Sequence, residues 1–387
     1  MQNKYIIANA VWEFTLDCNL SCIHCGSSAG SKRGDELTTS EAEKLCHDLK
    51  KSECIGITLM GGEPLLRKDF WHIASLIRDL GMELSVITNG TVYDRETFSK
   101  LRSLNPRTVA ISLDAAKPEL HDKIRGHKGA FEKTVNFMNI GLKEGLPVSA
   151  ITTVHKMNLM ELPAIRELLL GKSIAWQVQV AGSEGRRFPK KLLLDEEDFY
   201  SVGMFIASTR REYPVKQMPV VGADDLGFNS MMLNDISLAP EWTGCHAGIS
   251  VLGIQSNGNI KGCLSMTDIA IEGNVRSMSV YDIWNSDTAF SYSRGFDVSD
   301  AGENCRNCVY LKKCKGGCNE MSLMKTGKLH NDPYCFFAIE KKIFREELKN
   351  PVNRMRLKLK RRLNAITAEH GKRMPVMFKK MKPGAEK

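Results

Sequence analysis

The fold of this chain is decided by the stretch Val11-Trp12-Glu13-Phe14-Thr15-Leu16-Asp17-Cys18-Asn19-Leu20-Ser21-Cys22-Ile23-His24-Cys25. The alternation of apolar and polar residues over 11–16 predicts a β-strand. Three cysteines follow it at the spacing Cys-x3-Cys-x2-Cys. Three thiolates on one short loop can ligate three irons of a [4Fe-4S] cluster and leave the fourth without a protein ligand. We therefore predict an iron–sulfur cluster with one iron open to a second molecule.

A structural zinc site is the alternative interpretation of these cysteines. Tetrahedral zinc in such a site takes four protein ligands. His24 lies between Cys22 and Cys25 in the sequence, where it cannot easily supply the fourth ligand. Zinc is therefore the less favoured prediction for this loop.

A second motif follows the apolar run over 55–60, which predicts another strand. The run ends in Gly61-Gly62-Glu63-Pro64. Paired glycines let the backbone come close to a ligand, and a carboxylate can pair with an ammonium group. Taken alone, such a stretch is often an ordinary turn.

Together, the cysteine triplet and the Gly-Gly-Glu segment resemble the radical S-adenosylmethionine (SAM) enzymes. The resemblance implies that SAM chelates the open iron of a cluster held by Cys18, Cys22 and Cys25. It further implies cleavage of SAM to a 5′-deoxyadenosyl radical, which abstracts hydrogen from a substrate carbon. By the same resemblance, Gly61, Gly62, Glu63 and Pro64 are expected to bind the cofactor.

Length and cysteine content narrow the class of protein. The chain has 387 residues, 42% of them apolar, which is enough for a large α/β domain and a smaller second one. It shows neither a membrane-spanning stretch nor a signal peptide. Twelve cysteines without an export signal favour metal binding over disulfides. We expect a reducing, cytoplasmic location, with Cys46 and Cys54 as ordinary core residues.

Strand and helix patterns alternate six times in the first half of the chain. The expected strands are 11–16, 55–60, 83–88, 108–114, 147–154 and 175–180. The helix over 38–51 begins with a Thr-x-x-Glu capping box. Such alternation predicts a parallel sheet with right-handed crossovers. Six units predict an α/β fold with a partial (β/α)6 TIM-type barrel over 1–235, its site at the carboxyl ends of the strands.

Polar residues at two of these strand ends are further candidates for the cofactor site. Asn89 follows the third strand, and Ser112 and Asp114 end the fourth. In many radical SAM enzymes a serine here, and an arginine one short helix later, contact the SAM carboxylate. The resemblance thus implies this role for Ser112 and Arg125. Alternatively, Arg125 is a solvated helix charge and Ser112 a buried hydroxyl, and Asp114 either binds the ribose or caps the next helix.

Seven more cysteines stand between 245 and 335, in an order that resembles the SPASM domain, an auxiliary-cluster extension of radical SAM enzymes. We expect this domain over 240–340. By position, one auxiliary cluster would be held by Cys245, Cys263 and Cys318. The other would be held by Cys305, Cys308, Cys314 and Cys335, which makes three [4Fe-4S] clusters in all. A zinc ribbon is the alternative, but seven cysteines exceed one zinc site and fall short of two.

The first auxiliary cluster lacks a fourth cysteine, so we expect an open or non-cysteine position there, with His246 as the nearest candidate. Anaerobic sulfatase maturases place an aspartate base directly after the cysteine that matches Cys263. This chain has Leu264. Formylglycine formation is therefore not expected, and the sequence identifies no catalytic base.

The leading functional hypothesis is oxidative maturation of a ribosomally made peptide by cross-linking or dehydrogenation. The alternatives are a small-molecule or tetrapyrrole-modifying radical SAM enzyme and a non-catalytic redox scaffold. The expected partners are a precursor peptide, a separate leader-recognition protein and a low-potential electron donor of the flavodoxin or ferredoxin type.

Basic residues are concentrated in the tail over 341–387, which carries +12 of charge while the whole chain carries +9. The rest of the chain is slightly acidic, so nucleic-acid binding is not expected. The tail is expected to be helical or disordered. Its segment 354–362 could contact an acidic peptide or could simply be solvated.

Overall fold

The computed structural model describes residues 5–183, 185, 187–223, 226, 228–233, 236, 242–352 and 355. The chain divides into two compact units, Met1–Phe337 and Ala338–Lys387. The first unit is built on a ten-stranded sheet with the order β10-β9-β8-β1-β2-β3-β4-β5-β6-β7. Its central strands follow the order of the chain, as expected of consecutive β-α-β units.

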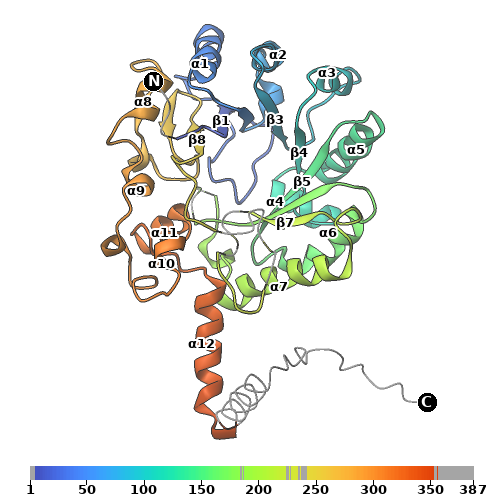
Figure 1. Ribbon diagram of the computed structural model, residues 1–387. Helices are drawn as coiled ribbons and strands as arrows, with labels where there is room; N and C mark the ends of the chain where they lie inside the picture. The colour runs from blue at the N-terminus through green and yellow to red at the C-terminus, as the bar shows by residue number, and fades with distance from the viewer. Residues whose placement is uncertain are drawn as a thin grey trace, which may run out of the picture. The chain divides into compact units, whose positions relative to one another are not determined.

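All six predicted strands are present, and each pairs in parallel with the next. They are β1 (Asn9–Thr15), β2 (Gly56–Gly61), β3 (Glu83–Thr88), β4 (Thr108–Ser112), β5 (Val148–Val154) and β6 (Ala175–Val180). The helices between them are α1 (Thr39–Lys51), α2 (Phe70–Asp79), α3 (Thr97–Ser103), α4 (Pro118–Arg125), α5 (Ala130–Lys143) and α6 (Leu162–Leu169). Helices α1, α2, α3 and α5 lie on the outer side of the strands (Figure 1). The partial-barrel prediction is confirmed.

The parallel series is longer than the six units that the sequence predicts. Strand β7 (Val220–Gly222) pairs in parallel with β6, and β8 (Val251–Ile254) pairs in parallel with β1. Strands β9 (Asn259–Lys261) and β10 (Gly273–Asn274) continue the sheet in antiparallel fashion. An edge strand leaves unpaired backbone groups, and these short additions satisfy them. The cysteine-rich region therefore shares the sheet of the barrel.

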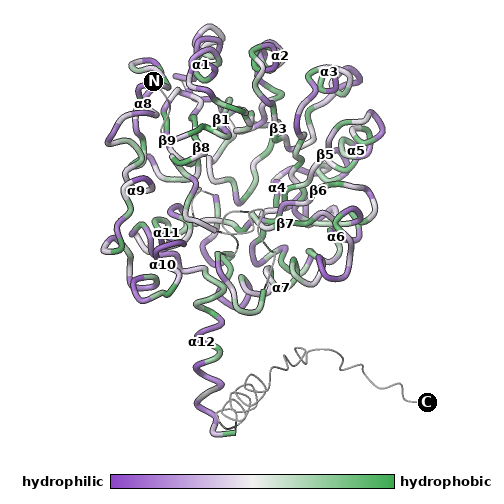
Figure 2. The backbone as a smooth tube through the Cα atoms, viewed as in Figure 1, coloured by the Kyte–Doolittle hydropathy of each residue, from purple (hydrophilic) through white to green (hydrophobic). Residues whose placement is uncertain are grey.

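The remaining elements surround this sheet or follow it. The 3-10 helices are η1 (Pro64–Leu66), η2 (Leu159–Glu161), η3 (Lys190–Leu192), η4 (Asp268–Ala270) and η5 (Val298–Asp300). The further α-helices are α7 (Glu196–Glu212), α8 (Val280–Asn285), α9 (Ser291–Arg294), α10 (Leu311–Cys314), α11 (Asn319–Thr326) and α12 (Phe336–Lys349). Hydropathy alternates along helices such as α5 and α6 (Figure 2).

Helix α1 shows how the local sequence signals act. Thr38 caps the helix by accepting a hydrogen bond from the Glu41 amide, and the Glu41 side chain accepts from the Thr38 amide, so the predicted capping box is present. The predicted apolar face, with Cys46 in it, is buried. Cys54 is 4% exposed and donates to the Gly56 carbonyl. Both cysteines are core residues, as predicted.

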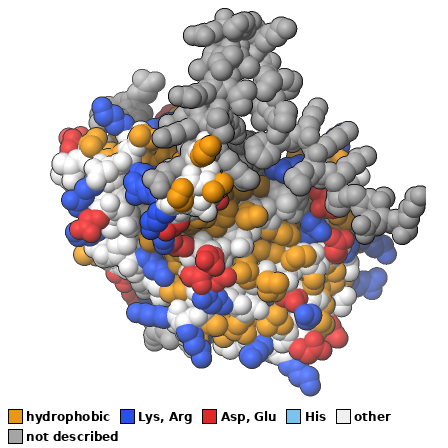
Figure 3. Space-filling view, turned by 90° about the horizontal axis from the view of Figure 1, so that it is seen from below, with side chains coloured by type: hydrophobic (Ala, Val, Ile, Leu, Met, Phe, Trp, Pro, Cys, Tyr) orange, Lys and Arg blue, Asp and Glu red, His pale blue; other side chains and the backbone are white. Residues whose placement is uncertain are grey.

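The surface carries no uniform charge on the face seen in Figure 3, where Lys and Arg alternate with Asp and Glu around apolar side chains. Among the described residues, no helix is both long and apolar enough to cross a membrane. In the predicted basic segment, residues 354 and 356–362 lie outside the described part of the chain.

Candidate active site

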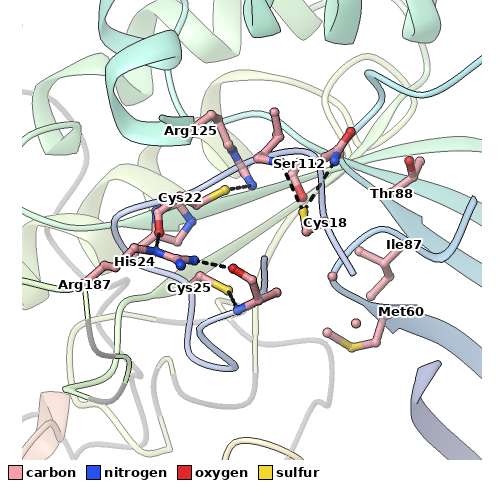
Figure 4. Close-up of a pocket in the computed structure, with 15 residues that line it drawn as sticks. Cys18, Cys22, His24, Cys25, Met60, Ile87, Thr88, Ser112, Arg125 and Arg187 are labelled. Carbon is pink, nitrogen blue, oxygen red and sulfur yellow. Dashed lines mark hydrogen bonds between the residues drawn. The ribbon is translucent and has the colours of Figure 1, made fainter. Parts of the chain in front are cut away.

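A cavity of about 580 Å³, counting its open mouth, lies at the carboxyl ends of the first four strands. The lining residues are Cys18, Leu20, Cys22, His24, Cys25, Ala29, Met60, Gly61, Gly62, Ile87, Thr88, Asn89, Ser112, Arg125 and Arg187. Figure 4 shows the three cysteines gathered around this space. The structure thus brings the two sequence motifs and the predicted Asn89, Ser112 and Arg125 to one site.

The cysteine loop is held by its own backbone. The Leu20 amide donates to Cys18 Sγ at 3.4 Å, and the Ala29 amide donates to Cys25 Sγ at 3.3 Å. Amide donors favour the thiolate form of a cysteine. Burial nevertheless raises the pKa of Cys18 to about 12, and the charge of Glu63 adds to this rise. A thiolate at this position therefore needs a cation beside it, which bound iron provides.

The structure shows why positions 61 and 62 are glycine, which the sequence does not reveal. A Cβ on Gly61 would lie 2.2 Å from the Thr15 carbonyl oxygen, and one on Gly62 would lie 2.1 Å from that of Asp17. The Gly62 amide donates to the Thr15 carbonyl at 2.7 Å, and the Glu63 amide donates to the Asp17 carbonyl at 2.8 Å. The glycines therefore clamp the start of the cysteine loop as well as line the cavity.

Glu63 is fully buried and does not line the cavity. Its carboxylate accepts hydrogen bonds from the Thr88 hydroxyl at 2.9 Å and from the Asn89 amide at 2.8 Å. Burial raises its pKa to about 7, despite these donors. In the structure, Glu63 thus ties the end of β2 to the end of β3. Pro64, predicted beside it, is buried at the start of η1 and also lies outside the cavity lining.

Asp114 and Arg125 form a buried ion pair. The distance from Arg125 Nη2 to Asp114 Oδ2 is 2.6 Å, and the two side chains are 8% and 0% exposed. His24 Nε2 lies 3.4 Å from the same carboxylate oxygen. Burial pushes the pKa of Asp114 up, but the charges of Arg125 and His24 outweigh it and leave the pKa below its usual value. The sequence-based alternative of a solvated Arg125 is wrong, because the guanidinium is buried in this pair.

Of the two roles predicted for Asp114, capping of the next helix is wrong, and binding of the ribose stays a prediction. It does not cap α4, whose N-cap is Lys117, and it is not among the residues that line the cavity. Its carboxylate also accepts from the Thr153 amide at 3.0 Å. Asp114 is therefore placed as a positioning residue behind Arg125, a role that only the tertiary structure reveals.

Three polar lining residues, Arg187, His24 and Thr88, were not predicted to bind the cofactor. Arg187 donates from Nε to the Cys22 carbonyl at 3.1 Å and from Nη2 to the Ala29 carbonyl at 2.8 Å, so it clamps both ends of the cysteine loop (Figure 4). His24 and Thr88 complete the set. Arg187 lies in an irregular segment beyond β6, where no local pattern marks it. His24 stands inside the cysteine motif, so its position could have suggested a role.

The donor set fits an iron–sulfur cluster with SAM bound to it. The three thiols face one cavity, and two buried nitrogens there, Arg125 Nε and His24 Nδ1, have no hydrogen-bond partner among the described residues. An unpaired guanidinium nitrogen suits a carboxylate ligand. Among the described residues, no three His, Cys, Asp or Glu side chains are close enough to hold a single metal ion.

The second group of cysteines comes from several separate segments. Burial raises the pKa of Cys263 to about 12, with further contributions from Glu320 and Cys245, and Cys318 lies near Cys245 as well. Burial also raises the pKa of Cys305 to about 11, with contributions from Asp332 and Cys308. Cys314 lies near Cys335 and Cys305. These neighbours are compatible with the two sets that the sequence order suggests, and the assignment of the seven cysteines to two clusters stays a prediction.

Family comparisons agree with this geometry. The profile of the radical SAM superfamily matches residues 12–169, and that of the SPASM iron–sulfur cluster-binding domain matches residues 245–309. The chain is 31% identical over 360 residues to an AdoMet-dependent heme synthase of Methanosarcina barkeri, covering 86% of this chain and 97% of that protein. This chain belongs to the radical SAM superfamily and carries a SPASM domain.

Other relatives differ in their named activities. The mycofactocin maturase MftC of Mycobacterium tuberculosis is 26% identical over 310 residues, covering 79% of this chain and 77% of that protein. The crystal structure of Streptococcus suis SuiB bound to S-adenosylmethionine superimposes with a TM-score of 0.68 at 17% identity, covering 83% of this chain and 75% of that one. This structural likeness establishes the fold.

Proposed function

We propose that this protein is a SAM-dependent oxidoreductase that abstracts hydrogen from a carbon of a ribosomally made peptide. The observation that carries the proposal is the cavity that joins Cys18, Cys22 and Cys25 to the glycine pair at the end of β2. A [4Fe-4S] cluster bound there supplies reductive cleavage of SAM. The protein positions SAM and the substrate and excludes water from the cavity.

Each residue of the cavity has a proposed task. Arg125, held by Asp114 and carrying an unpaired Nε, binds the SAM carboxylate with the help of Ser112. The backbone of Gly61 and Gly62, which lines the cavity, would bind the SAM amino group. Asn89, which donates from Nδ2 to Asn19 Oδ1 at 2.9 Å, keeps the loop after Cys18 in place. Glu63 and Pro64, which lie outside the cavity lining, support the backbone of Gly61 and Gly62.

The seven cysteines of the SPASM domain favour an oxidative outcome. We propose that they hold two further clusters, which take up the electron left after hydrogen abstraction. Removal of one hydrogen atom and then one electron and one proton gives net oxidation by two electrons, with the clusters as the first acceptor. A flavodoxin- or ferredoxin-type protein then exchanges electrons with the enzyme.

The peptide substrate is supported by the similarity to the mycofactocin maturase. A separate leader-recognition protein is part of this proposal. A second candidate, modification of an iron tetrapyrrole, is supported by the similarity to the heme synthase, which has the higher identity and covers 97% of that relative. The two candidates share the cavity and the clusters and differ in the substrate and in the group that the substrate loses.

The test is anaerobic turnover of the reconstituted, reduced enzyme with SAM. We expect release of 5′-deoxyadenosine, which a non-catalytic scaffold would not give. Co-expression with the peptide encoded beside the gene should then yield a peptide lighter by two hydrogens, detected by mass spectrometry. If the peptide is unmodified and an added iron tetrapyrrole loses carbon dioxide, the proposal of a peptide substrate is wrong and tetrapyrrole modification is favoured.

A further inference from the structure

The first auxiliary set, Cys245, Cys263 and Cys318, offers three thiolates for a cluster of four irons. The structure places a carboxylate beside this set. Glu320 Oε2 lies 4.0 Å from Cys263 Sγ. Glu320 stands two residues after Cys318, in the first turn of α11.

The turn that carries Glu320 is firmly held. The Cys318 amide donates to Asp332 Oδ2 at 2.8 Å, and the Ser322 hydroxyl donates to the Cys318 carbonyl at 2.7 Å. Asn319 Nδ2 donates to Ser293 Oγ at 3.3 Å. Cys318 and Glu320 therefore come from one rigid turn, so a ligand at 320 is oriented before any metal binds.

The other oxygen of the carboxylate faces the barrel. A Cβ on Gly182, just after β6, would lie 3.5 Å from Glu320 Oε1 and 3.0 Å from Met324 Cε. The carboxylate thus lies between the Cys263 sulfur and the chain that leaves β6.

His246, the candidate from the sequence, is engaged elsewhere. Its Nδ1 lies 3.1 Å from Ser250 Oγ, and its ring meets the Trp242 ring edge to face with the centroids 5.7 Å apart. These contacts engage Nδ1 and the ring and leave Nε2 as the ring nitrogen that could bind iron, whereas Glu320 is the carboxylate placed beside Cys263. The sequence did not single out Glu320, because a carboxylate in the first turn of a helix is an ordinary feature.

We propose that Glu320 is the fourth, non-cysteine ligand of the auxiliary cluster held by Cys245, Cys263 and Cys318. The inference rests on the proposed assignment of these three cysteines to one cluster. An oxygen ligand donates less charge to iron than a thiolate does. Replacement of the carboxylate by a thiolate therefore lowers the reduction potential of the cluster.

The test uses the full chain with Cys18, Cys22 and Cys25 replaced by Ala, which removes the other open iron. In this background, Glu320, Glu320→Gln and Glu320→Cys are compared, with the exposed Asp287→Asn as the control for loss of a surface carboxylate. After mild oxidation, we expect Glu320→Gln to lose about one iron per chain and to show a several-fold larger [3Fe-4S] signal by electron paramagnetic resonance. Glu320→Cys should keep the iron and titrate at a lower potential, and Asp287→Asn should match the parent.

The proposal is overturned if Glu320→Gln keeps the iron content, the spectrum and the midpoint potential of the parent. It is also overturned if the parent itself holds no more than one auxiliary cluster. If Glu320→Cys loses the same iron as Glu320→Gln, a ligating side chain at this position does not retain iron, and the role of Glu320 is structural only. None of these readouts involves SAM or substrate, so their outcome is independent of the substrate proposed above.

Discussion

The two cysteine regions of this protein are built in opposite ways. At the amino terminus, three cysteines lie within eight residues of one loop, and their spacing alone places them together. In the SPASM region, seven cysteines are spread from Cys245 to Cys335. No local spacing can place them together, so any cluster that they hold depends on the tertiary fold. The first region is a local motif, and the second is a product of the tertiary fold.

The local motif is nevertheless not self-sufficient. The Ser21 amide donates to the Arg125 carbonyl at 3.2 Å, and the Ile23 amide donates to the Ile124 carbonyl at 2.9 Å, so the loop rests on the end of α4. Arg187, in the segment after β6, donates hydrogen bonds to the carbonyls of Cys22 and Ala29. The short motif thus predicts which residues are the ligands. Residues distant in the sequence hold the loop that carries them. The predictions below test this division.

The largest effect is expected from Cys22→Ala. Loss of one of three ligands on a single loop should remove the amino-terminal cluster, about four irons per chain, and abolish SAM cleavage. Iron analysis and chromatographic detection of 5′-deoxyadenosine measure both. The matched control is Cys46→Ala, a buried cysteine in α1 that should keep the iron and cost about 1 kcal/mol of stability. Normal cleavage by Cys22→Ala would contradict the proposed ligand.

In the SPASM region, Cys308→Ala should act differently. SAM cleavage without product formation is expected to survive, because the amino-terminal site is intact, while product formation is lost. The ratio of 5′-deoxyadenosine to product measures this uncoupling, again against Cys46→Ala. If Cys308→Ala makes product at the normal rate, the electron-acceptor role of that cluster is wrong.

Arg125→Met tests whether the amino-terminal motif depends on a distant ion pair. Removing the guanidinium leaves Asp114 buried without its partner, which should cost about 3–5 kcal/mol of unfolding free energy. Anaerobic chemical denaturation measures the loss. The double variant Arg125→Met with Asp114→Asn should recover part of it. A loss below about 1 kcal/mol in the single variant would show that the pair does not support the loop.

A smaller effect is expected from the pH dependence of Glu63. Burial raises its pKa to about 7, whereas in the unfolded chain it ionises near 4.5. Between these values the native state keeps a proton that the unfolded chain has released, so stability falls as pH rises and levels off above about pH 7. The total change is about 3 kcal/mol. Glu63→Gln should reduce the pH dependence of the unfolding free energy between pH 5 and 8. If the pH dependence is unchanged, groups other than Glu63 cause it.

Much of the fold could be predicted from the sequence. Six strands, the capped helix α1 and the buried roles of Cys46 and Cys54 follow from periodicity and local capping signals, and the structure has them all. Strands β7 and β8 could not be predicted, because each is only three or four residues long and is stabilised by pairing with β6 or β1. Pairing over such sequence distances leaves no local pattern.

The same division holds for the candidate site. The sequence by itself determined which residues carry the chemistry, because ligand identity and loop spacing are local properties. Only the tertiary structure decided the surroundings of these residues. Asp114 forms an ion pair with Arg125, Glu63 accepts a hydrogen bond from Thr88, and Glu320 lies beside Cys263. The physical reason is that burial and charge depend on neighbours far away in the sequence, which are set by packing and not by the order of the chain.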